Sequence, residues 1–341
     1  MKPAPPAETA VRLSIVLPVH NEQAVLPQTH ARLAACADAW AADGVEATFL
    51  FVNDGSRDAT ADLLDDLAAR DSRVIAVHLT RNFGHQAAIT AGLELAAGDV
   101  VAIMDADLQD PPEVLPRFLE KWREGYQVVY AVRQKRKENA FKRLAYWTFY
   151  RLLAATSDVA IPLDAGDFCL MDRHAVDLLN RLPERQRFVR GLRTWVGLKQ
   201  IGVAYERDAR AAGEPQYTFG KLLALAADGL VSFSGAPLRL VTRLGVACAA
   251  LSGVFLLWVL IDGLFGVTNF NRGWPSLAAL VTFLGSVQLV SLGIIGEYLS
   301  RIFLEVKGRP TYLVARVVGG VKQAKARADE RRDGGPPPHS P

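Results

Sequence analysis

The sequence predicts an α/β protein in which a mostly parallel sheet domain is followed by a membrane hairpin. Apolar runs rich in β-branched residues alternate with amphipathic stretches between residues 13 and 221. Residues 244–261 and 275–296, in contrast, contain no Asp, Glu, Lys or Arg. Alternating strands and helices favour parallel strands with helices on both faces, and long uncharged runs favour helices within a bilayer.

The first domain is expected to occupy residues 13–221. Its strands are predicted where β-branched residues cluster, at Ser14–Val19, Ala47–Val52, Val74–Leu79, Val100–Met104 and Val128–Val132. Its helices are predicted between them, at Glu22–Ala39, Thr60–Ala69, His85–Ala97 and Pro112–Glu124. We expect the sheet to be complete before Lys221, with the chemistry beyond the carboxyl ends of its strands.

The composition favours a reduced compartment and gives no sign of nucleic-acid binding. The three cysteines, Cys36, Cys169 and Cys248, lack the spacing of a metal site, and scattered cysteines are typical of the cytosol. A net charge of +3 does not suggest a nucleic-acid partner. Residues 1–12 are expected to be a flexible tail and not a signal peptide.

The chain after residue 221 is expected to lie on and in the cytoplasmic membrane. Residues 222–240 are predicted as an interfacial helix, and residues 244–267 and 275–297 as two spans within 241–301. Residues 139–156 fit a second interfacial helix or a helix packed on the domain. Basic residues at both outer ends of the hairpin place the termini in the cytosol.

Two alternatives stay open for this region. A buried helical hairpin in a soluble protein would show the same apolar runs, and the hairpin also leaves self-association as a homo-oligomer open. Residues 302–341 are expected to form a cytosolic segment that ends in a disordered basic tail.

Three acidic loops follow three of the predicted strands. In the sharpest, residues 105–110 (DADLQD), carboxylates two residues apart suit Mg²⁺ or Mn²⁺ shared with a diphosphate. The alternative is a polar turn in which Asp110 caps the next helix. Asp54 follows the second strand, where the motif alone would also fit a turn. Glu22 follows the first strand, in a motif that is uninformative by itself. Acids gathered at one sheet edge repel one another unless a cation or ligand lies among them.

The order SIVLPVHNE, VNDGS, IMDADLQDPPE resembles the inverting family-2 glycosyltransferases of the GT-A fold. From about residue 13 to residue 313 the chain is similar to their polyisoprenyl-phosphate group, which includes dolichol-phosphate mannose synthases and bactoprenol glucosyltransferases. The resemblance implies a Rossmann-like GT-A domain, interfacial helices and a two-helix transmembrane hairpin. It also implies a nucleotide-sugar donor, a polyisoprenyl phosphate acceptor and Mg²⁺ or Mn²⁺ as cofactor.

The resemblance also implies a role for each of a set of residues. Nucleotide-sugar binding is implied for Pro18, Glu22, Asp54, Asp105, Arg190 and Trp195. Metal binding is implied for Asp107 and Gln109, and contact with the acceptor phosphate for Arg133 and Arg143. The acceptor-side catalytic carboxylate is implied to be Asp167, with Asp164 as the second candidate. In one departure from the family pattern, Pro215-Gln216-Tyr217 stands where relatives often carry Ser-Lys-Tyr.

The activity implied by the resemblance is metal-dependent transfer of a hexose to undecaprenyl phosphate at the cytoplasmic membrane face. UDP-glucose is the favoured donor, and GDP-mannose, UDP-N-acetylglucosamine and an amino-arabinose donor are the alternatives. A processive polysaccharide synthase would need a conduit that two spans do not obviously supply. A non-catalytic membrane scaffold would have no reason to keep acids at three strand ends. A dinucleotide oxidoreductase is disfavoured because no GxGxxG follows the first strand.

Overall fold

The computed structural model of the chain describes residues 10–133, 165–185, 187–206 and 274–320, together with part of 238–257. The chain divides into two compact units. The first comprises residues 1–139, 161–216 and 310–341, and the second comprises residues 140–160 and 217–309.

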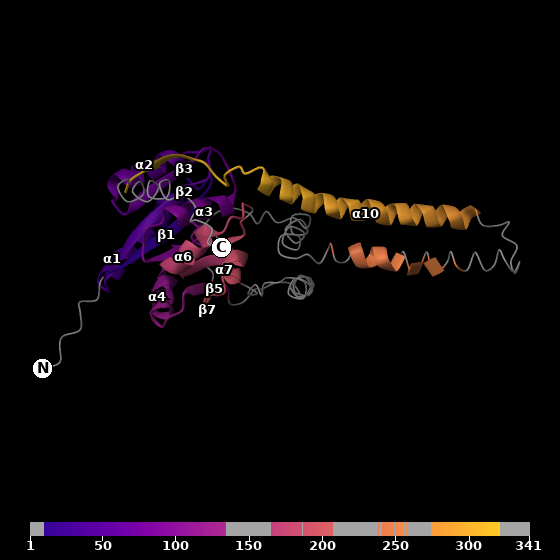
Figure 1. The fold of residues 1–341 in the computed structure, drawn as a ribbon. Coiled ribbons are helices and arrows are strands. Elements are labelled where there is room, and N and C mark those ends of the chain that lie inside the picture. The colour runs from indigo at the N-terminus through magenta and orange to yellow at the C-terminus, as the bar shows by residue number, and fades with distance from the viewer. Residues whose placement is uncertain are drawn as a thin grey trace, which may run out of the picture. The chain divides into compact units, whose positions relative to one another are not determined.

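The first unit is built on one eight-stranded sheet (Figure 1). Its strands are β1 (Val11–Val19), β2 (Val45–Asn53), β3 (Val74–Leu79), β4 (Val100–Ile103), β5 (Val128–Arg133), β6 (Ala165–Asp172), β7 (Gln200–Tyr205) and β8 (Val314–Val318). The spatial order is β7-β5-β6-β4-β1-β2-β3-β8. Strands β6 and β8 run antiparallel to their neighbours, and the other pairings are parallel. The predicted mostly parallel sheet is therefore a mixed one, and all five predicted strands form.

Helices cover both faces of this sheet. One face carries α1 (Leu26–Ala41), α2 (Thr60–Arg70) and α4 (Leu115–Arg123), the last preceded by the short 3-10 helix η1 (Pro112–Val114). The other face carries α3 (His85–Leu95), α6 (Arg173–Arg181) and α7 (Val189–Trp195). The first helix begins later than predicted, at Leu26, with a proline in its first turn where the missing N–H costs nothing.

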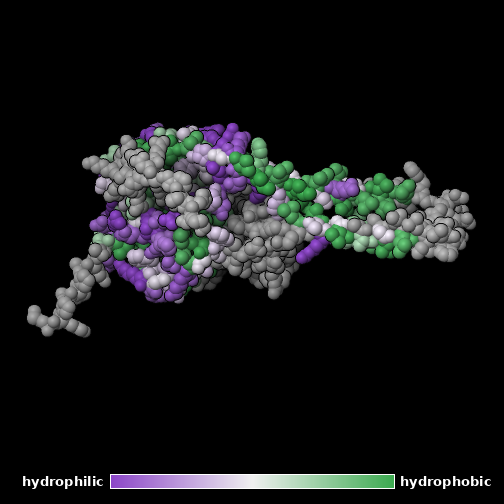
Figure 2. Space-filling model, in the orientation of Figure 1, coloured by the Kyte–Doolittle hydropathy of each residue, from purple (hydrophilic) through white to green (hydrophobic). Residues whose placement is uncertain are grey.

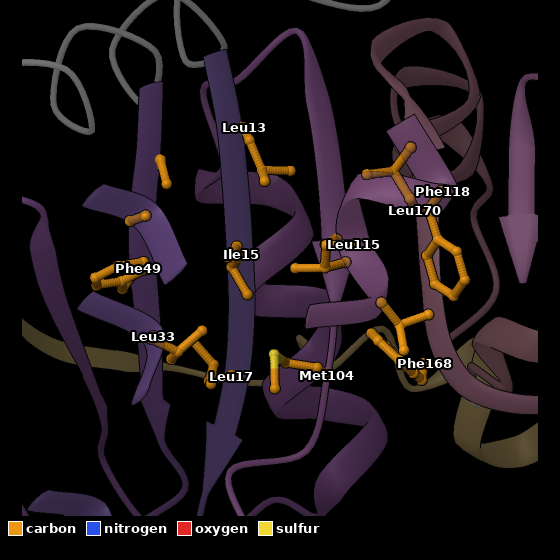
Figure 3. Close-up of a cluster of buried hydrophobic side chains, with 14 of the residues drawn as sticks. Leu13, Ile15, Leu17, Leu33, Phe49, Met104, Leu115, Phe118, Phe168 and Leu170 are labelled. Carbon is orange, nitrogen blue, oxygen red and sulfur yellow. The ribbon is translucent and has the colours of Figure 1, made fainter. Parts of the chain in front are cut away.

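Alternation along β1 divides the core between the two faces. Leu13, Ile15 and Leu17 point toward the face that carries α1 and α4 (Figure 3). Val16 points to the opposite face, where α3 packs so closely that a Cβ on Gly92 would lie 2.2 Å from Val16 Cγ1. All four β1 side chains are fully buried. Burial on both faces fixes the register of the central strand, because a one-residue slip would exchange the two sets.

The eighth strand corrects one expectation. β8 pairs antiparallel with β3, from Ala76 opposite Val318 to Leu79 opposite Val314. The prediction that the sheet is complete before Lys221 is therefore wrong. The physical reason is that β8 has only five residues, and its pairing with the distant strand β3 stabilises it more than its local sequence does. The basic tail predicted after this strand lies beyond residue 320, outside the described residues.

The second unit is described mainly through one long apolar helix, α10 (Trp274–Val306). Its part Phe283–Val306 is long and apolar enough to cross a membrane, with a mean hydropathy of 1.4 and no burial of that window. Figure 2 shows hydrophobic side chains along it. Among the described residues it is the one helix of this kind. The second predicted span, 275–297, lies inside α10, which continues past Glu297.

The rest of the predicted membrane region stays a prediction. Of the first span, 244–267, the described residues between 244 and 257 are helical, and the others lie outside the described residues. The interfacial helices predicted at 139–156 and 222–240 also fall almost wholly outside them. The two-helix hairpin therefore stays a prediction, and among the described residues one helix is long and apolar enough to span a membrane.

Candidate active site

The register of the sheet brings two of the predicted acids to one edge. Asp105 follows the carboxyl end of β4, and Asp167 lies near the start of β6. The two strands are antiparallel neighbours in which Ile103 pairs with Cys169. Residues two positions beyond this pair, 105 and 167, therefore reach the same edge of the sheet. This edge is also where β1, β2 and β3 end.

A histidine lies between these two carboxylates. His85 begins α3, and its Nε2 lies 3.6 Å from Asp105 Oδ1 and 3.6 Å from Asp167 Oδ2. Burial lowers the pKa of His85, but the carboxylates of Asp167 and Asp105 outweigh burial and hold this pKa above its ordinary value of 6.5. His85 is not among the site residues predicted from the sequence. Its only signal was its position at a helix start beyond a strand, which fits many histidines.

Asp167 is enclosed by groups that favour its charged form. Gln86 Nε2 donates a hydrogen bond of 3.2 Å to Asp167 Oδ2, and Arg190 Nη2 lies 3.5 Å from Oδ1. Burial raises the pKa of Asp167, but His85, Arg190 and Arg193 outweigh it and lower this pKa to about 2. Such a carboxylate is ionised at neutral pH and accepts a proton poorly. A carboxylate in this setting can orient the side chains of His85, Gln86 and Arg190 around it.

Asp105 has the opposite electrostatic setting. Burial raises its pKa, His85 partly offsets this, and the nearby acids Asp110, Asp107 and Asp167 raise it further, to about 6. The edge thus holds more negative charge than its own cations compensate. A bound cation would remove this excess and keep Asp105 ionised.

The 105–110 loop fits a divalent cation whose shell is shared with a ligand. Asp107 Oδ1 accepts a hydrogen bond from Gln109 N at 3.1 Å, and Leu108 between them has a left-handed backbone with φ of 62°. That conformation is costly for leucine and is typical of functional loops. Within the described residues no three His, Cys, Asp or Glu side chains form a metal cage. Mg²⁺ usually binds through one or two carboxylates and substrate phosphates, so Asp105, Asp107 and the Gln109 amide suit it.

Asp110 is held inside the protein. It is 2% exposed, and its Oδ1 accepts a hydrogen bond of 2.7 Å from the Tyr205 hydroxyl of β7. The 3-10 helix that follows starts after Pro111 without a side-chain cap. The alternative in which Asp110 caps the helix is therefore not supported, and Asp110 instead ties the loop to β7.

Asp54 organises a neighbouring loop. It is 3% exposed, and its two oxygens accept hydrogen bonds from Phe83 N at 2.7 Å and Gly84 N at 2.8 Å. These amides belong to the loop from which α3 starts. Gly55 has a φ of 60°, and a Cβ there would lie 2.3 Å from the carbonyl carbon of Arg81. The loops after β2 and β3 thus pack tightly, and the predicted contact of Asp54 with the nucleotide stays a prediction.

The remaining donor-side residues lie at the end of β1 and on α7. Pro18 is buried within β1, and Glu22 donates its backbone N–H to Thr60 Oγ1 at 3.0 Å. Trp195 ends α7 and is 59% exposed. Their contacts with a nucleotide-sugar stay predictions.

Helix α7 brings a second arginine that the sequence analysis did not select. Arg190 and Arg193 are three positions apart and so share a face of the helix. Arg193 is 1% exposed, and its guanidinium carbon lies 5.3 Å from the centre of the Tyr130 ring. Its charge helps to lower the pKa of Asp167. Only the folded structure identifies Arg193 as part of the site, because it shows this buried arginine close to Asp167.

The side chains of three predicted site residues lie outside the part of the chain that the structure describes. Arg133 ends β5, where it pairs with Tyr205, but its side chain is outside the described residues. Asp164 and Arg143 lie wholly outside them. Their predicted roles stay predictions.

The raised pKa of Asp105 predicts that this residue weakens the fold when no cation is bound. A raised acid pKa favours the folded state below the ordinary value of 3.8, and this contribution is lost as pH rises through about 6. After allowance for solvent screening, Asp105→Asn should stabilise the cation-free protein at neutral pH by about 1 kcal/mol, or roughly 2–4 °C. The gain should vanish toward pH 4, measured by thermal unfolding of the full chain. A less stable Asp105→Asn protein at neutral pH would contradict the charge crowding.

Comparison with known proteins finds similar sequences along most of the chain. The sequence matches the family described as Glycosyl transferase family 2 over residues 14–179. It is 45% identical to "Uncharacterized glycosyltransferase YkcC" of Bacillus subtilis (strain 168), over 91% of this chain and 95% of that protein. It is 40% identical to the "SfII prophage-derived bactoprenol glucosyl transferase" of Shigella flexneri, over 90% of this chain and 98% of that protein.

Proposed function

The chain belongs to the family-2 glycosyltransferases, within their polyisoprenyl-phosphate group, and on that premise we propose that it transfers a hexose from a nucleotide-sugar to undecaprenyl phosphate. The observation that carries the proposal is the 40% identity, along nearly the whole chain, to a protein named bactoprenol glucosyl transferase. UDP-glucose is the favoured donor for the same reason. GDP-mannose, UDP-N-acetylglucosamine and an amino-arabinose donor remain the alternatives.

The reaction is a single in-line displacement. A phosphate oxygen of the lipid forms a bond to the anomeric carbon of the sugar while the bond from that carbon to the diphosphate breaks. The bonding electrons leave with the nucleoside diphosphate, and the anomeric configuration inverts. A phosphate monoester is already largely ionised near neutral pH, so the acceptor needs positioning more than it needs a base.

The residues at the sheet edge divide into a leaving-group side and an acceptor side. Asp105, Asp107 and Gln109 would hold Mg²⁺ or Mn²⁺, which when bound neutralises charge on the departing diphosphate. Asp167 keeps its negative charge at neutral pH and orients His85 and the side chain of Gln86 beside it. Because the acceptor phosphate is already largely ionised, the reaction does not need a strong base. A carboxylate with a pKa of about 2 can therefore act on the acceptor side.

The membrane part brings the enzyme to its acceptor. Moving a polyisoprenyl chain out of lipid costs about 0.8 kcal/mol for each CH₂, so the lipid stays in the bilayer. The apolar helix α10 supports one crossing. We propose the second span, a multi-pass arrangement in the cytoplasmic membrane, and a catalytic domain with both termini in the cytosol. A cytosolic site faces the supply of nucleotide-sugar.

Arg133→Ala is expected to damage use of the lipid acceptor and to spare binding of the donor. Charge-assisted hydrogen bonds to a phosphate are worth about 1.5–3 kcal/mol, which corresponds to a loss of roughly 10- to 150-fold in acceptor kcat/KM. Acceptor kinetics and calorimetry of nucleotide-sugar binding separate the two effects. An equal loss of donor affinity would move Arg133 to the diphosphate side.

A panel of donors tests the proposed function as a whole. The full-length chain, purified in detergent, is offered each candidate nucleotide-sugar with undecaprenyl phosphate and Mg²⁺ or Mn²⁺. The proposal expects a lipid-linked sugar from UDP-glucose before the others. Transfer from a different donor alone would revise the sugar, and no lipid-linked product from any donor would refute the function.

A further inference from the structure

A continuous series of polar contacts runs from the edge strand β8 through α2 and β3 to the loop after β2. Arg316 Nη1 on β8 lies 2.6 Å from Asp65 Oδ2 on α2. The other oxygen, Asp65 Oδ1, lies 3.1 Å from His78 Nε2 on β3. His78 Nδ1 lies 3.0 Å from Asn53 Nδ2 at the end of β2, and Asn53 Oδ1 is 3.0 Å from Ser56 N. We name these five residues the Arg316 relay.

The direction of every hydrogen bond in the relay follows from its two ends. Ser56 N can only donate, so Asn53 turns its oxygen toward Ser56 and its NH₂ toward His78. His78 Nδ1 must then accept, which leaves the proton on Nε2 to donate to Asp65. His78 is therefore neutral in the intact relay. It is 4% exposed and Asn53 is 3% exposed, so neither readily exchanges its partner for water.

The relay ends at loops on the proposed donor side of the site. Ser56 Oγ accepts a hydrogen bond of 3.0 Å from Asn21 N, and Asn21 Oδ1 accepts one of 2.8 Å from Arg57 N. These two bonds join the loop after β1 to the loop after β2. Two predicted donor-side residues are adjacent in sequence to these contacts: Glu22 follows Asn21, and Asp54 follows Asn53. Asn53 thus connects His78 to the loop that carries Asp54 and Ser56.

The far end of the relay, Arg316, lies shortly after the segment that follows the apolar helix. Residues 307–313 connect α10 to β8. Leu313 O accepts a hydrogen bond of 2.9 Å from the N–H of Thr80, which directly follows β3, and the Tyr312 hydroxyl donates one of 2.5 Å to Glu94 Oε2 on α3. The chain leaving α10 is therefore bound to β3 and α3 before it reaches Arg316.

We propose that Arg316 and His78 are positioning residues that hold the loops after β1 and β2 in their donor-binding shape. The inference rests on the proposed function for the identity of the ligand, a nucleotide-sugar. It assigns the C-terminal strand β8 a part in donor binding, in addition to closing the edge of β3. Neither residue touches the reacting atoms, so their effect passes through Asn53 and Ser56.

Acid should open the relay. The charged groups that face His78 are Asp65 and Asp62 on α2 and Arg316 on β8. Burial, and then the Arg316 charge, lower the pKa of His78 below 6.5. A lowered histidine pKa supplies stability above 6.5, and this is lost as pH falls through the lower folded value. Protonation would place two donors, His78 Nδ1 and Asn53 Nδ2, against each other.

Arg316→Met in the full-length chain tests the proposal, because it removes the charge and keeps the side-chain length. Backbone hydrogen exchange of a peptide covering residues 53–59 should become roughly threefold faster, and the donor KM roughly threefold higher with kcat little changed. The acid limb of the donor KM should move toward neutral pH, because the His78 pKa rises without Arg316. Arg316→Lys keeps the positive charge, so its hydrogen exchange and donor KM should stay close to those of the parent protein. Tyr312→Phe is the control, since it removes a bond of the same segment outside the relay.

Two results would overturn the inference. One is unchanged exchange at residues 53–59 and an unchanged pH profile in Arg316→Met, with a loss of thermal stability alone. The other is an equal effect of Tyr312→Phe on exchange and donor KM. If the parent protein transfers no sugar but Arg316→Met still speeds exchange at 53–59, the proposed function fails while the positioning of the loops stands.

Discussion

Asp107→Asn is expected to lower kcat/KM for sugar transfer on the order of 10³-fold, because it weakens binding of the cation that would neutralise the diphosphate. Asparagine keeps an oxygen that can accept the Gln109 N–H at this position, so the loop should keep its shape. Removing one charge from a crowded acidic edge should not lower thermal stability. Initial rates over a titration of Mg²⁺ and Mn²⁺, with thermal unfolding in parallel, measure both effects.

Asp43→Asn is the matched control for this variant. Asp43 is exposed in the turn before β2, at the opposite edge of the sheet from residue 107. Its substitution should leave transfer unchanged. Full activity of the parent protein in excess chelator would remove the metal assignment, whatever Asp107→Asn does.

The second large effect is expected for Asp167→Asn, a loss on the order of 10²- to 10³-fold in kcat. The substitution removes the charge that partners His85 Nε2 and Arg190 Nη2. His85 should lose part of its raised pKa, because the Asp167 carboxylate is one of its causes. In the parent protein Asp167 should contribute no acid limb above about pH 4, since its pKa is about 2. Rates measured against pH for both proteins test this.

The pH profile separates an orienting carboxylate from a general base. A base would give the parent protein a limb near neutral pH that Asp167→Asn abolishes. Asp66→Asn serves as the control, because Asp66 is an exposed acid of α2 paired only loosely, at 3.6 Å, with Arg70. A near-neutral limb that disappears in Asp167→Asn but not in Asp66→Asn would contradict the orienting role.

The parallel strands and their acidic loops could be predicted from local pattern. Apolar β-branched runs mark β1 to β5, and acids directly after β4 reach the sheet edge because the strand ends there. Asp167 reached the prediction only through family resemblance. Its place beside Asp105 depends on β6 running antiparallel to β4, which no local feature of the sequence specifies.

Other parts of the site depend on contacts between distant residues. His85 is one histidine at a helix start, and only the folded sheet places it between Asp105 and Asp167. Within one short motif Asp107 borders the proposed metal position, whereas Asp110 is buried against Tyr205. Strand β8 was missed because its partner, β3, is more than two hundred residues earlier in the chain. Pairings at such separations are set by tertiary packing, and local propensity is a weak guide to them.

The central claim is that the phosphate of a polyisoprenyl lipid accepts one sugar, and analysis of the reaction product tests it most directly. Full-length protein in detergent is incubated with UDP-glucose, undecaprenyl phosphate and Mn²⁺, and the lipid fraction is examined by mass spectrometry and by NMR of the anomeric centre. The account predicts one hexose per lipid phosphate, inverted anomeric configuration, and release of one nucleoside diphosphate for each sugar transferred. A polymer of sugars on the lipid, or retained configuration, would contradict it.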